Sequence, residues 1–225
     1  MQRHQASVCR ASKNIYITFL CMKHNHMENV MNTTFTYNAY YQTRITETMD
    51  KALIRHPRTT AIRVDLRIPN AYWSTFPSAL ITRFFESLKA KVAVDLRKKE
   101  RSWQKKLACK VSYAWVRELG PISGKLHFHV LLMLNKDIYF SLGDFREVNG
   151  TLASLVQQAW CSALGLPYPE YRQLVHFPRG GVMHMDSNHP DFTQQWQLVM
   201  GKADYLAKEA TKHYGDGLRS FGCSR

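Results

Sequence analysis

The sequence has few acidic residues, no closely spaced cysteine pair and no long apolar run. Only 17 Asp and Glu stand against 31 Lys and Arg, which gives a formal net charge of +14. The five cysteines are scattered without a CxxC pair, which argues against a disulfide framework and against a zinc ribbon. The longest apolar run near the N-terminus, residues 15–22, is far too short to cross a bilayer, and no small-residue cleavage site follows it. We therefore expect a soluble, intracellular protein with reduced thiols.

The excess of positive charge indicates a polyanionic partner. A charge of +14 raises the local concentration of polyanions and speeds their capture. Nucleic acid is the commonest such partner, although an anionic membrane surface or simple solubility would also account for the charge. The 225 residues, 45% of them hydrophobic, suffice for one domain with a full core, with or without a short arm. A GxxxxGK[ST] motif is lacking, so no ATPase of that type is expected.

Alternating apolar residues predict the strands. Residues 1–50 lack sustained periodicity and predict an N-terminal arm that is weakly structured or partly helical, with the folded domain spanning residues 51–225. Residues 59–68 alternate strictly, as a half-buried strand does. Two further alternating segments flank turn residues and predict an antiparallel hairpin, and two short strand candidates follow later; these four segments are residues 110–119, 126–134, 174–177 and 182–185.

Helical spacing of apolar residues predicts three helices. They begin near residues 75, 144 and 191, and the last is expected to run to residue 213. The first continues into the strongly basic segment 97–110, which is either a solvated helix end or a surface that follows phosphates. Strands separated by helices, with an antiparallel central hairpin, predict an α+β sandwich in which helices cover one face of a single sheet.

Two histidines on one strand are the candidate metal ligands. His127 and His129 are two residues apart, so both imidazoles leave the same face of the strand, while Phe128 points the other way. If the hairpin turns at its glycines, Glu118 lies opposite the pair and could share an ion with it. A His-x-His pattern also arises by chance and alone is a weak motif. Here it interrupts a very apolar strand, where a histidine is costly to bury without a partner.

A tyrosine on the last predicted helix is the candidate nucleophile. Tyr205 falls about half a turn from the apolar stripe of that helix, on a face not needed for packing. Lys208 and Lys212 are expected beside it, with Lys202 on its other flank. Ammonium groups near a phenol suit attack on a phosphate. A surface tyrosine lying along lysine stems is the alternative.

These motifs together resemble those of the HUH endonucleases of rolling-circle replication. The shared pattern is an acidic residue, a His-hydrophobic-His strand, and a Tyr-x-x-Lys helix at Tyr205 and Lys208. More closely, the segments RVDLRIP, KLHFHVLLMLN, DYLAKEATK and RSFGCSR are similar to the inovirus Gp2 family, also known as the YagK/YfjJ C-terminal domain family, of prophages and related mobile elements. The likeness covers residue 37 to the C-terminus.

The resemblance implies a fold, a cofactor and an activity. It implies a five-stranded antiparallel sheet with flanking helices, of ferredoxin-like or RRM-like kind, and Mg²⁺ or Mn²⁺ held by His127, His129 and a third ligand, here Glu118. Tyr205 matches the nucleophile of the family and Lys208 the lysine one turn later. Tyr214 would lie on the opposite face of a straight helix, which implies a one-tyrosine enzyme.

The resulting hypothesis is a replication-associated enzyme that nicks and joins single-stranded DNA. Tyr205 would form a 5′-phosphotyrosine and release a 3′-OH that a host polymerase can extend, with strand separation by a host helicase in the bacterial cytoplasm. The DNA partner would be a single strand or an origin hairpin. The residues expected to bind it are Arg63, Arg67, Lys105, Lys106, Lys202 and Lys212.

Two other functions are compatible with parts of the sequence. A non-catalytic DNA-binding or regulatory protein of a mobile element would need the positive net charge but would not use the candidate catalytic site. A mononuclear Fe(II) oxygenase could use two histidines and a carboxylate, but it leaves the charge of +14 and the Tyr205 face without a role.

Overall fold

The computed structural model describes residues 36–69, 79–120, 125–212 and 214–225. They belong to a compact unit that spans Phe35–Arg225. Its helices are α2 (Ala39–Arg55), α3 (Leu80–Trp103), α4 (Leu152–Leu164) and α5 (Phe192–Ala207), with short 3-10 turns η2 (Arg172–Leu174) and η3 (Glu209–Thr211). Its strands are β1 (Arg58–Arg67), β2 (Ser112–Leu119), β3 (Leu126–Asn135), β4 (Val175–His176), β5 (Val182–Asp186) and β6 (Phe221–Cys223).

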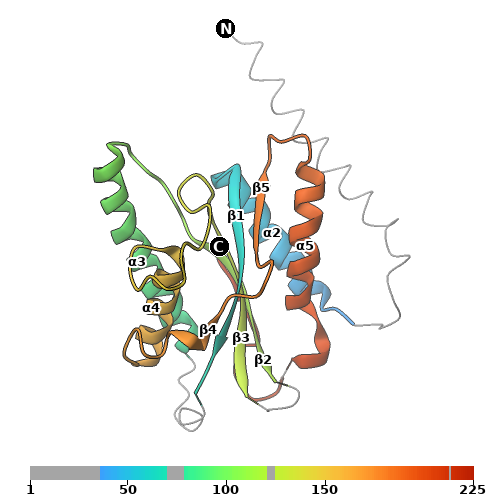
Figure 1. Ribbon diagram of the computed structural model, residues 1–225. Helices are drawn as coiled ribbons and strands as arrows, with labels where there is room; N and C mark the ends of the chain where they lie inside the picture. Colours follow the sequence, from blue (N-terminus) through green and yellow to red (C-terminus); the bar gives the residue numbers. More distant parts are fainter. Residues whose placement is uncertain (1–35, 70–78, 121–124, 213) are drawn as a thin grey trace. The chain divides into compact units, whose positions relative to one another are not determined.

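The strands form one antiparallel sheet in the order β4-β1-β3-β2-β6, with β5 also paired to β1 (Figure 1). β4 pairs with one end of β1 and β5 with the other, so the two short strands share one edge of the sheet. The predicted strands and the β2–β3 hairpin are confirmed. The sheet has six strands rather than the expected five, and β6 was not anticipated because three residues are too few for an alternating pattern.

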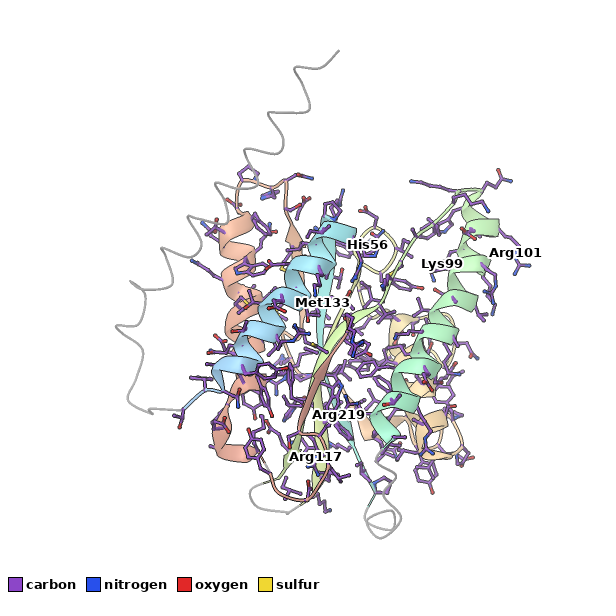
Figure 2. All side chains as sticks on the ribbon, turned by 180° about the vertical axis from the view of Figure 1, so that it is seen from behind. His56, Lys99, Arg101, Arg117, Met133 and Arg219 are labelled. Atoms are coloured by element: carbon purple, nitrogen blue, oxygen red, sulfur yellow. The ribbon has the colours of Figure 1, made fainter. Side chains whose placement is uncertain are left out.

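Helices cover both faces of the sheet, so the prediction of one covered face was wrong. α3 and α4 lie on one side of the sheet and α2 and α5 on the other (Figure 1), and α2 and α5 contact each other side by side (Figure 2). The reason is visible in β3, where both sets of alternating residues are apolar in the second half of the strand. Leu132 and Leu134 join the core with α3 and α4, while Leu131 and Met133 are equally buried on the other face.

Helix α2 lies mostly in the segment that was predicted to be weakly structured or partly helical. Asn38 caps it by accepting a hydrogen bond from the backbone N–H of Tyr41. Its buried residues lie at helical spacing, but polar side chains interrupt the apolar pattern. They are Tyr41, Ile45, Thr48, Met49, Ala52 and Leu53. The expected boundary at residue 50 falls inside this helix.

Three helix ends differ from the expected ones. α3 ends at Trp103 rather than near residue 110, because Gln104 takes a left-handed conformation. α4 begins at Leu152 rather than near residue 144, because a capping box between Thr151 and Ser154 starts the helix there. The expected start of α3 near residue 75 lies outside the described residues.

Helix α5 ends at Ala207, six residues before the expected end at 213. Lys208 has an extended backbone and forms an isolated bridge with Tyr37, and Lys212 forms another with Glu118. Backbone groups of this segment therefore pair with neighbouring elements instead of continuing the helix. None of the described helices is long and apolar enough to cross a membrane.

The C-terminal segment is fixed by one buried guanidinium on β2. Arg117, labelled in Figure 2, makes a bidentate pair with Asp216, with Nη1–Oδ2 at 2.5 Å and Nη2–Oδ1 at 2.8 Å. The same guanidinium also donates to the Leu218 carbonyl at 3.3 Å. These contacts hold the chain after α5 against the sheet and lead it into β6.

Candidate metal centre

The register of the three central strands gathers the candidate ligands on the face covered by α2 and α5. His127 on β3 lies opposite Glu118 on β2, as the hairpin predicted. His129 lies opposite Asp65 on β1. Because side chains two apart on a strand share a face, the two histidines and both carboxylates project to the same side of the sheet.

One ligand atom from each of Glu118, His127 and His129 lies within 4.8 Å of the others. The Nε2 atoms of the two imidazoles are 3.0 Å apart. Glu118 Oε2 lies 3.3 Å from His129 Nε2 and 4.0 Å from His127 Nε2. The three residues predicted from the sequence therefore lie together, at a spacing that one ion can bridge.

The outer hydrogen bonds of the imidazoles determine where their lone pairs point. His129 Nδ1 lies 2.6 Å from Asp65 Oδ1, and His127 Nδ1 lies 3.2 Å from the Lys125 carbonyl. Both partners only accept, so both Nδ1 atoms carry a proton, and in the neutral form of each imidazole its Nε2 atom presents a lone pair. These lone pairs converge on each other and on Glu118 Oε2. Convergent acceptors repel unless a proton or a metal ion lies between them, and a metal ion there gives the arrangement of a carboxylate–histidine–metal site.

Burial and charge act against each other on these groups. Burial alone would raise the pKa of Glu118, but hydrogen bonds from His129 and Lys212 lower that pKa to about 2. Burial would lower the pKa of His129, but its hydrogen bonds to Asp65 and Glu118 raise the pKa above its ordinary value. The pKa of His127 is lowered, chiefly by burial. Glu118 is therefore an anion at neutral pH, and His127 a neutral ligand.

Lys212 is part of this cluster rather than of the surface. Its side chain is fully buried, and its ammonium donates to Glu118 Oε1 at 2.5 Å. Lys212 was predicted to lie beside Tyr205 as a DNA-binding residue, whereas in the structure its ammonium pairs with the Glu118 carboxylate. Glu118 thus offers one oxygen to the histidines while the other is held by Lys212.

Tyr205 reaches the same cluster from α5. Its ring meets the His129 ring edge to face, with centroids 5.2 Å apart, and 38% of the residue is exposed. The Arg63 guanidinium lies over the tyrosine ring, with Cζ 4.3 Å from its centroid. The expected neighbour, Lys208, follows the last residue of α5, and Lys202 is exposed on that helix. The cation stacked on Tyr205 is therefore an arginine of β1.

Tyr214 does not lie on α5, because the helix ends at Ala207. The expectation of a tyrosine on the opposite face of a straight helix was therefore wrong. Tyr214 is exposed, and its hydroxyl donates to Glu209 Oε2 at 2.8 Å.

The remaining basic residues lie at two separate ends of the sheet. Arg67 is exposed and lies opposite His127, at the end of the sheet that holds the ligands. Lys105 and Lys106 line a hollow together with Asn135, the last residue of β3. Six residues separate Asn135 from His129, which is roughly 20 Å along a strand. The structure therefore does not bring these two lysines to the candidate metal ligands.

Sequence reasoning missed the role of Asp65. The alternation of β1 placed it on the polar face, between Arg63 and Arg67, but the pairing of β1 with β3 cannot be read from either strand alone. Burial would raise the pKa of Asp65, but the hydrogen bond with His129 lowers the pKa below its ordinary value. His176 of β4 lies opposite Asp65 on the other side and was also not anticipated.

Comparison with known proteins assigns the chain to a family. The chain is 36% identical over 193 residues to the uncharacterized protein YagK of Escherichia coli strain K12, covering 82% of this chain and 92% of that protein. It is 35% identical over 195 residues to the uncharacterized protein YfjJ of the same strain, covering 82% and 93%. No solved structure matches it. The model of the YagK/YfjJ C-terminal domain matches residues 21–224, and the chain therefore belongs to this family.

Proposed function

We propose that this protein nicks and rejoins single-stranded DNA, as an HUH endonuclease of the inovirus Gp2 kind, with Tyr205 as the nucleophile. The observation that carries the proposal is the convergence of two imidazole Nε2 atoms and a buried carboxylate, with the Tyr205 ring in contact with one of those imidazoles. A tyrosine, a metal-ligand set and basic residues at one place are what phosphodiester transesterification needs.

The donor set fits a divalent ion. Glu118, His127 and His129 would hold Mg²⁺ or Mn²⁺, and two nitrogens in the set favour the softer Mn²⁺. Such an ion, when bound, polarises a phosphoryl oxygen as a Lewis acid. Three protein ligands leave further coordination positions for substrate. Asp65 and the Lys125 carbonyl hold the imidazole tautomers that present Nε2 to the ion.

Tyr205 performs the bond exchange. Its hydroxyl oxygen forms a bond to phosphorus as the bond to the 3′ oxygen breaks, and the phenol proton is lost while the 3′ oxygen gains one. The products are a 5′-phosphotyrosine and a free 3′-OH, and the reverse exchange rejoins the strand. Arg63, stacked on the tyrosine ring, offsets charge on the phosphate, and Lys208 remains a candidate for a second phosphate contact. Arg67, exposed beside His127, would hold the DNA backbone.

Trapping the covalent intermediate tests the proposal. Pooled single-stranded oligonucleotides labelled at the 3′ end are incubated with Mn²⁺ and resolved on a denaturing gel. Because the tyrosine keeps the 5′ phosphate, we expect the 3′ label to move with the protein. The adduct should disappear with EDTA and in Tyr205→Phe, and persist in the matched control Tyr214→Phe. An adduct that survives in Tyr205→Phe would refute the assignment of the nucleophile.

Non-catalytic DNA binding is the second candidate function, and one observation favours it. Lys212 already neutralises Glu118. Burial would lower the pKa of His129, but its hydrogen bonds to Asp65 and Glu118 raise that pKa, so a proton can take the place of a metal ion. In that case the cluster stabilises the fold and the protein acts by binding alone. DNA binding that is unchanged by EDTA, with no adduct on any strand, would support this function.

A further inference from the structure

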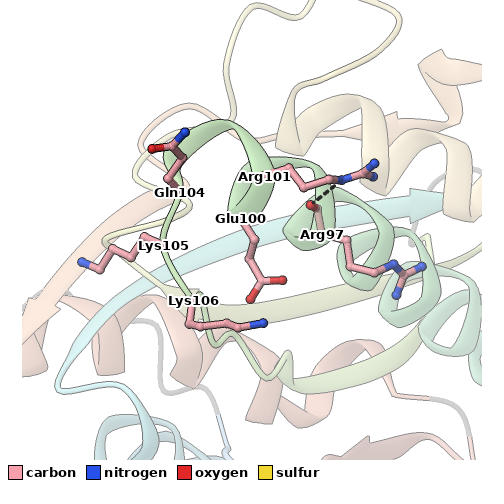
Figure 3. Close-up of a pocket in the computed structure, with 6 residues that line it drawn as sticks. All are labelled: Arg97, Glu100, Arg101, Gln104, Lys105 and Lys106. Carbon is pink, nitrogen blue, oxygen red and sulfur yellow. Dashed lines mark hydrogen bonds between the residues drawn. The ribbon is translucent and has the colours of Figure 1, made fainter.

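A basic hollow lies at the end of the sheet opposite the candidate metal centre. Figure 3 shows Arg97 and Arg101 on one wall, Lys105 and Lys106 on the other, and Glu100 between them. The hollow has a volume of about 450 Å³. A second hollow of about 290 Å³ shares both lysines and adds Arg55 and Trp103. We call the joint surface of these residues the basic hollow.

The two carboxylates in the lining are already engaged. Glu100 accepts a hydrogen bond from the backbone N–H of Leu107 at 3.0 Å, so it holds the turn after α3. Asp137 pairs with Arg58, with Nε–Oδ1 at 3.1 Å. The surface therefore presents an excess of cations, and an anion bound there meets little opposing charge.

The backbone after α3 is bent so that the lysines return beside the helix. Gln104 has φ 50° and ψ 38°, a left-handed conformation that favours glycine and is uncommon for a residue with a side chain. The reversal carries Lys105 and Lys106 back to the wall opposite Arg97 and Arg101 (Figure 3). The dipole of α3 favours a cation in its last turn, where Arg101 lies, but it does not account for two lysines beyond the helix end.

Trp103 adds an aromatic face to this charge. It is the last residue of α3, it lines the hollow beside both lysines, and 48% of it is exposed. A half-exposed indole among cations is the combination that single-stranded nucleic acid binding uses, because bases stack on the ring while the cations bind the phosphates. A duplex, whose bases are already stacked, gains nothing from the indole.

We propose that the basic hollow is a second nucleic-acid site, which binds a single strand through its phosphates and one base stacked on Trp103. It goes beyond the nicking function, since Asn135 at its edge lies roughly 20 Å along β3 from His129, and the site needs neither the metal nor Tyr205. A strand held there stays bound to the protein whether or not the phosphodiester at Tyr205 is open.

Binding in EDTA tests this site apart from cleavage. Fluorescence anisotropy with a labelled oligothymidylate and with a duplex of equal length is measured for the full chain. We expect Trp103→Ala to weaken single-strand binding by at least about fivefold and to leave duplex binding unchanged, with Trp103→Phe close to the wild type. Thermal unfolding of each variant shows that it is folded.

The salt dependence of binding tests the lysines. For Lys105→Gln/Lys106→Gln, we expect the slope of log K against log salt to become shallower by about 1.4, since each lost phosphate contact contributes about 0.7 on a single strand. The matched control Lys51→Gln/Lys89→Gln removes two exposed lysines elsewhere and should keep the wild-type slope. The proposal is overturned if Trp103→Ala binds the single strand as the wild type does, if it weakens the duplex equally, or if both lysine pairs change the slope alike. None of these outcomes bears on adduct formation at Tyr205.

Discussion

Asp65 should control the metal affinity of the candidate metal centre without being one of its ligands. Its carboxylate accepts from His129 Nδ1 at 2.6 Å, which fixes the tautomer and orientation of that ligand. Removing such an outer partner typically costs 10- to 100-fold in metal affinity, or about 1.4–2.7 kcal/mol. We expect Asp65→Ala to lie near the upper end of this range, because the Nδ1–H then loses its acceptor inside a buried site. Asp65→Asn should lie near the lower end, because its amide oxygen still accepts although the charge is lost.

Isothermal titration with Mn²⁺ measures both variants directly. The matched control is Asp186→Asn, which removes a carboxylate from β5 at the other end of β1. It should bind Mn²⁺ as the wild type does. If Asp65→Ala binds Mn²⁺ with unchanged affinity, the hydrogen bond does not orient a ligand and the argument from the imidazole tautomers fails.

Three further predictions follow from buried contacts. Lys212→Met should destabilise the metal-free protein by about 3–5 kcal/mol, because it removes the ammonium of a buried ion pair and leaves the Glu118 carboxylate with His129 alone; chemical denaturation checks this, and Glu118→Gln in the same chain should restore much of the loss. The free energy of unfolding should fall as the pH drops from 4.5 towards 2. Burial would raise the pKa of Glu118 in the folded protein, but His129 and Lys212 lower it to about 2, so in this pH range Glu118 takes up a proton when the protein unfolds. A pH series of unfolding midpoints should therefore be flatter in Glu118→Gln; an equal slope contradicts the assignment. Gly222→Ala should cost about 1–3 kcal/mol, since its Cβ would lie 2.6 Å from the indole Nε1 of buried Trp115; wild-type thermal stability in this variant would show that the indole can move aside.

The strands were predictable because their signal is local. Alternation identified β1, β2 and β3, and the turn residues gave the hairpin register that places Glu118 opposite His127. The end of α5 was not, because Lys208 and Lys212 form bridges to residues far away in the sequence instead of continuing the helix. The same reason hid Asp65, whose partner His129 lies 64 residues further along the chain.

The clustering of Glu118, His127 and His129 was predicted, but the arrangement of the charges around them was not. Glu118, His127 and His129 are residue types that can bind metal ions, and their spacing along the hairpin was enough to predict that they lie together. Lys212 was placed on the surface because a continuous helix to residue 213 was assumed, and the stacking of Arg63 on Tyr205 was not anticipated. Both contacts involve long side chains, whose position depends on the tertiary fold rather than on local sequence.

These charges determine what a metal ion at the site could do. Two carboxylates, Asp65 and Glu118, are matched by two cations, the Lys212 ammonium on Glu118 and the Arg63 guanidinium, whose Nε lies 3.5 Å from Asp65 Oδ1. A divalent ion added to a site whose own charges already balance keeps its attraction for an incoming phosphodiester. Without Lys212 and Arg63, the carboxylates would bind the ion more tightly but would offset that attraction. In the proposed nuclease, the buried lysine and the stacked arginine would thus favour substrate binding at the expense of metal affinity, a balance that a purely structural metal site does not require.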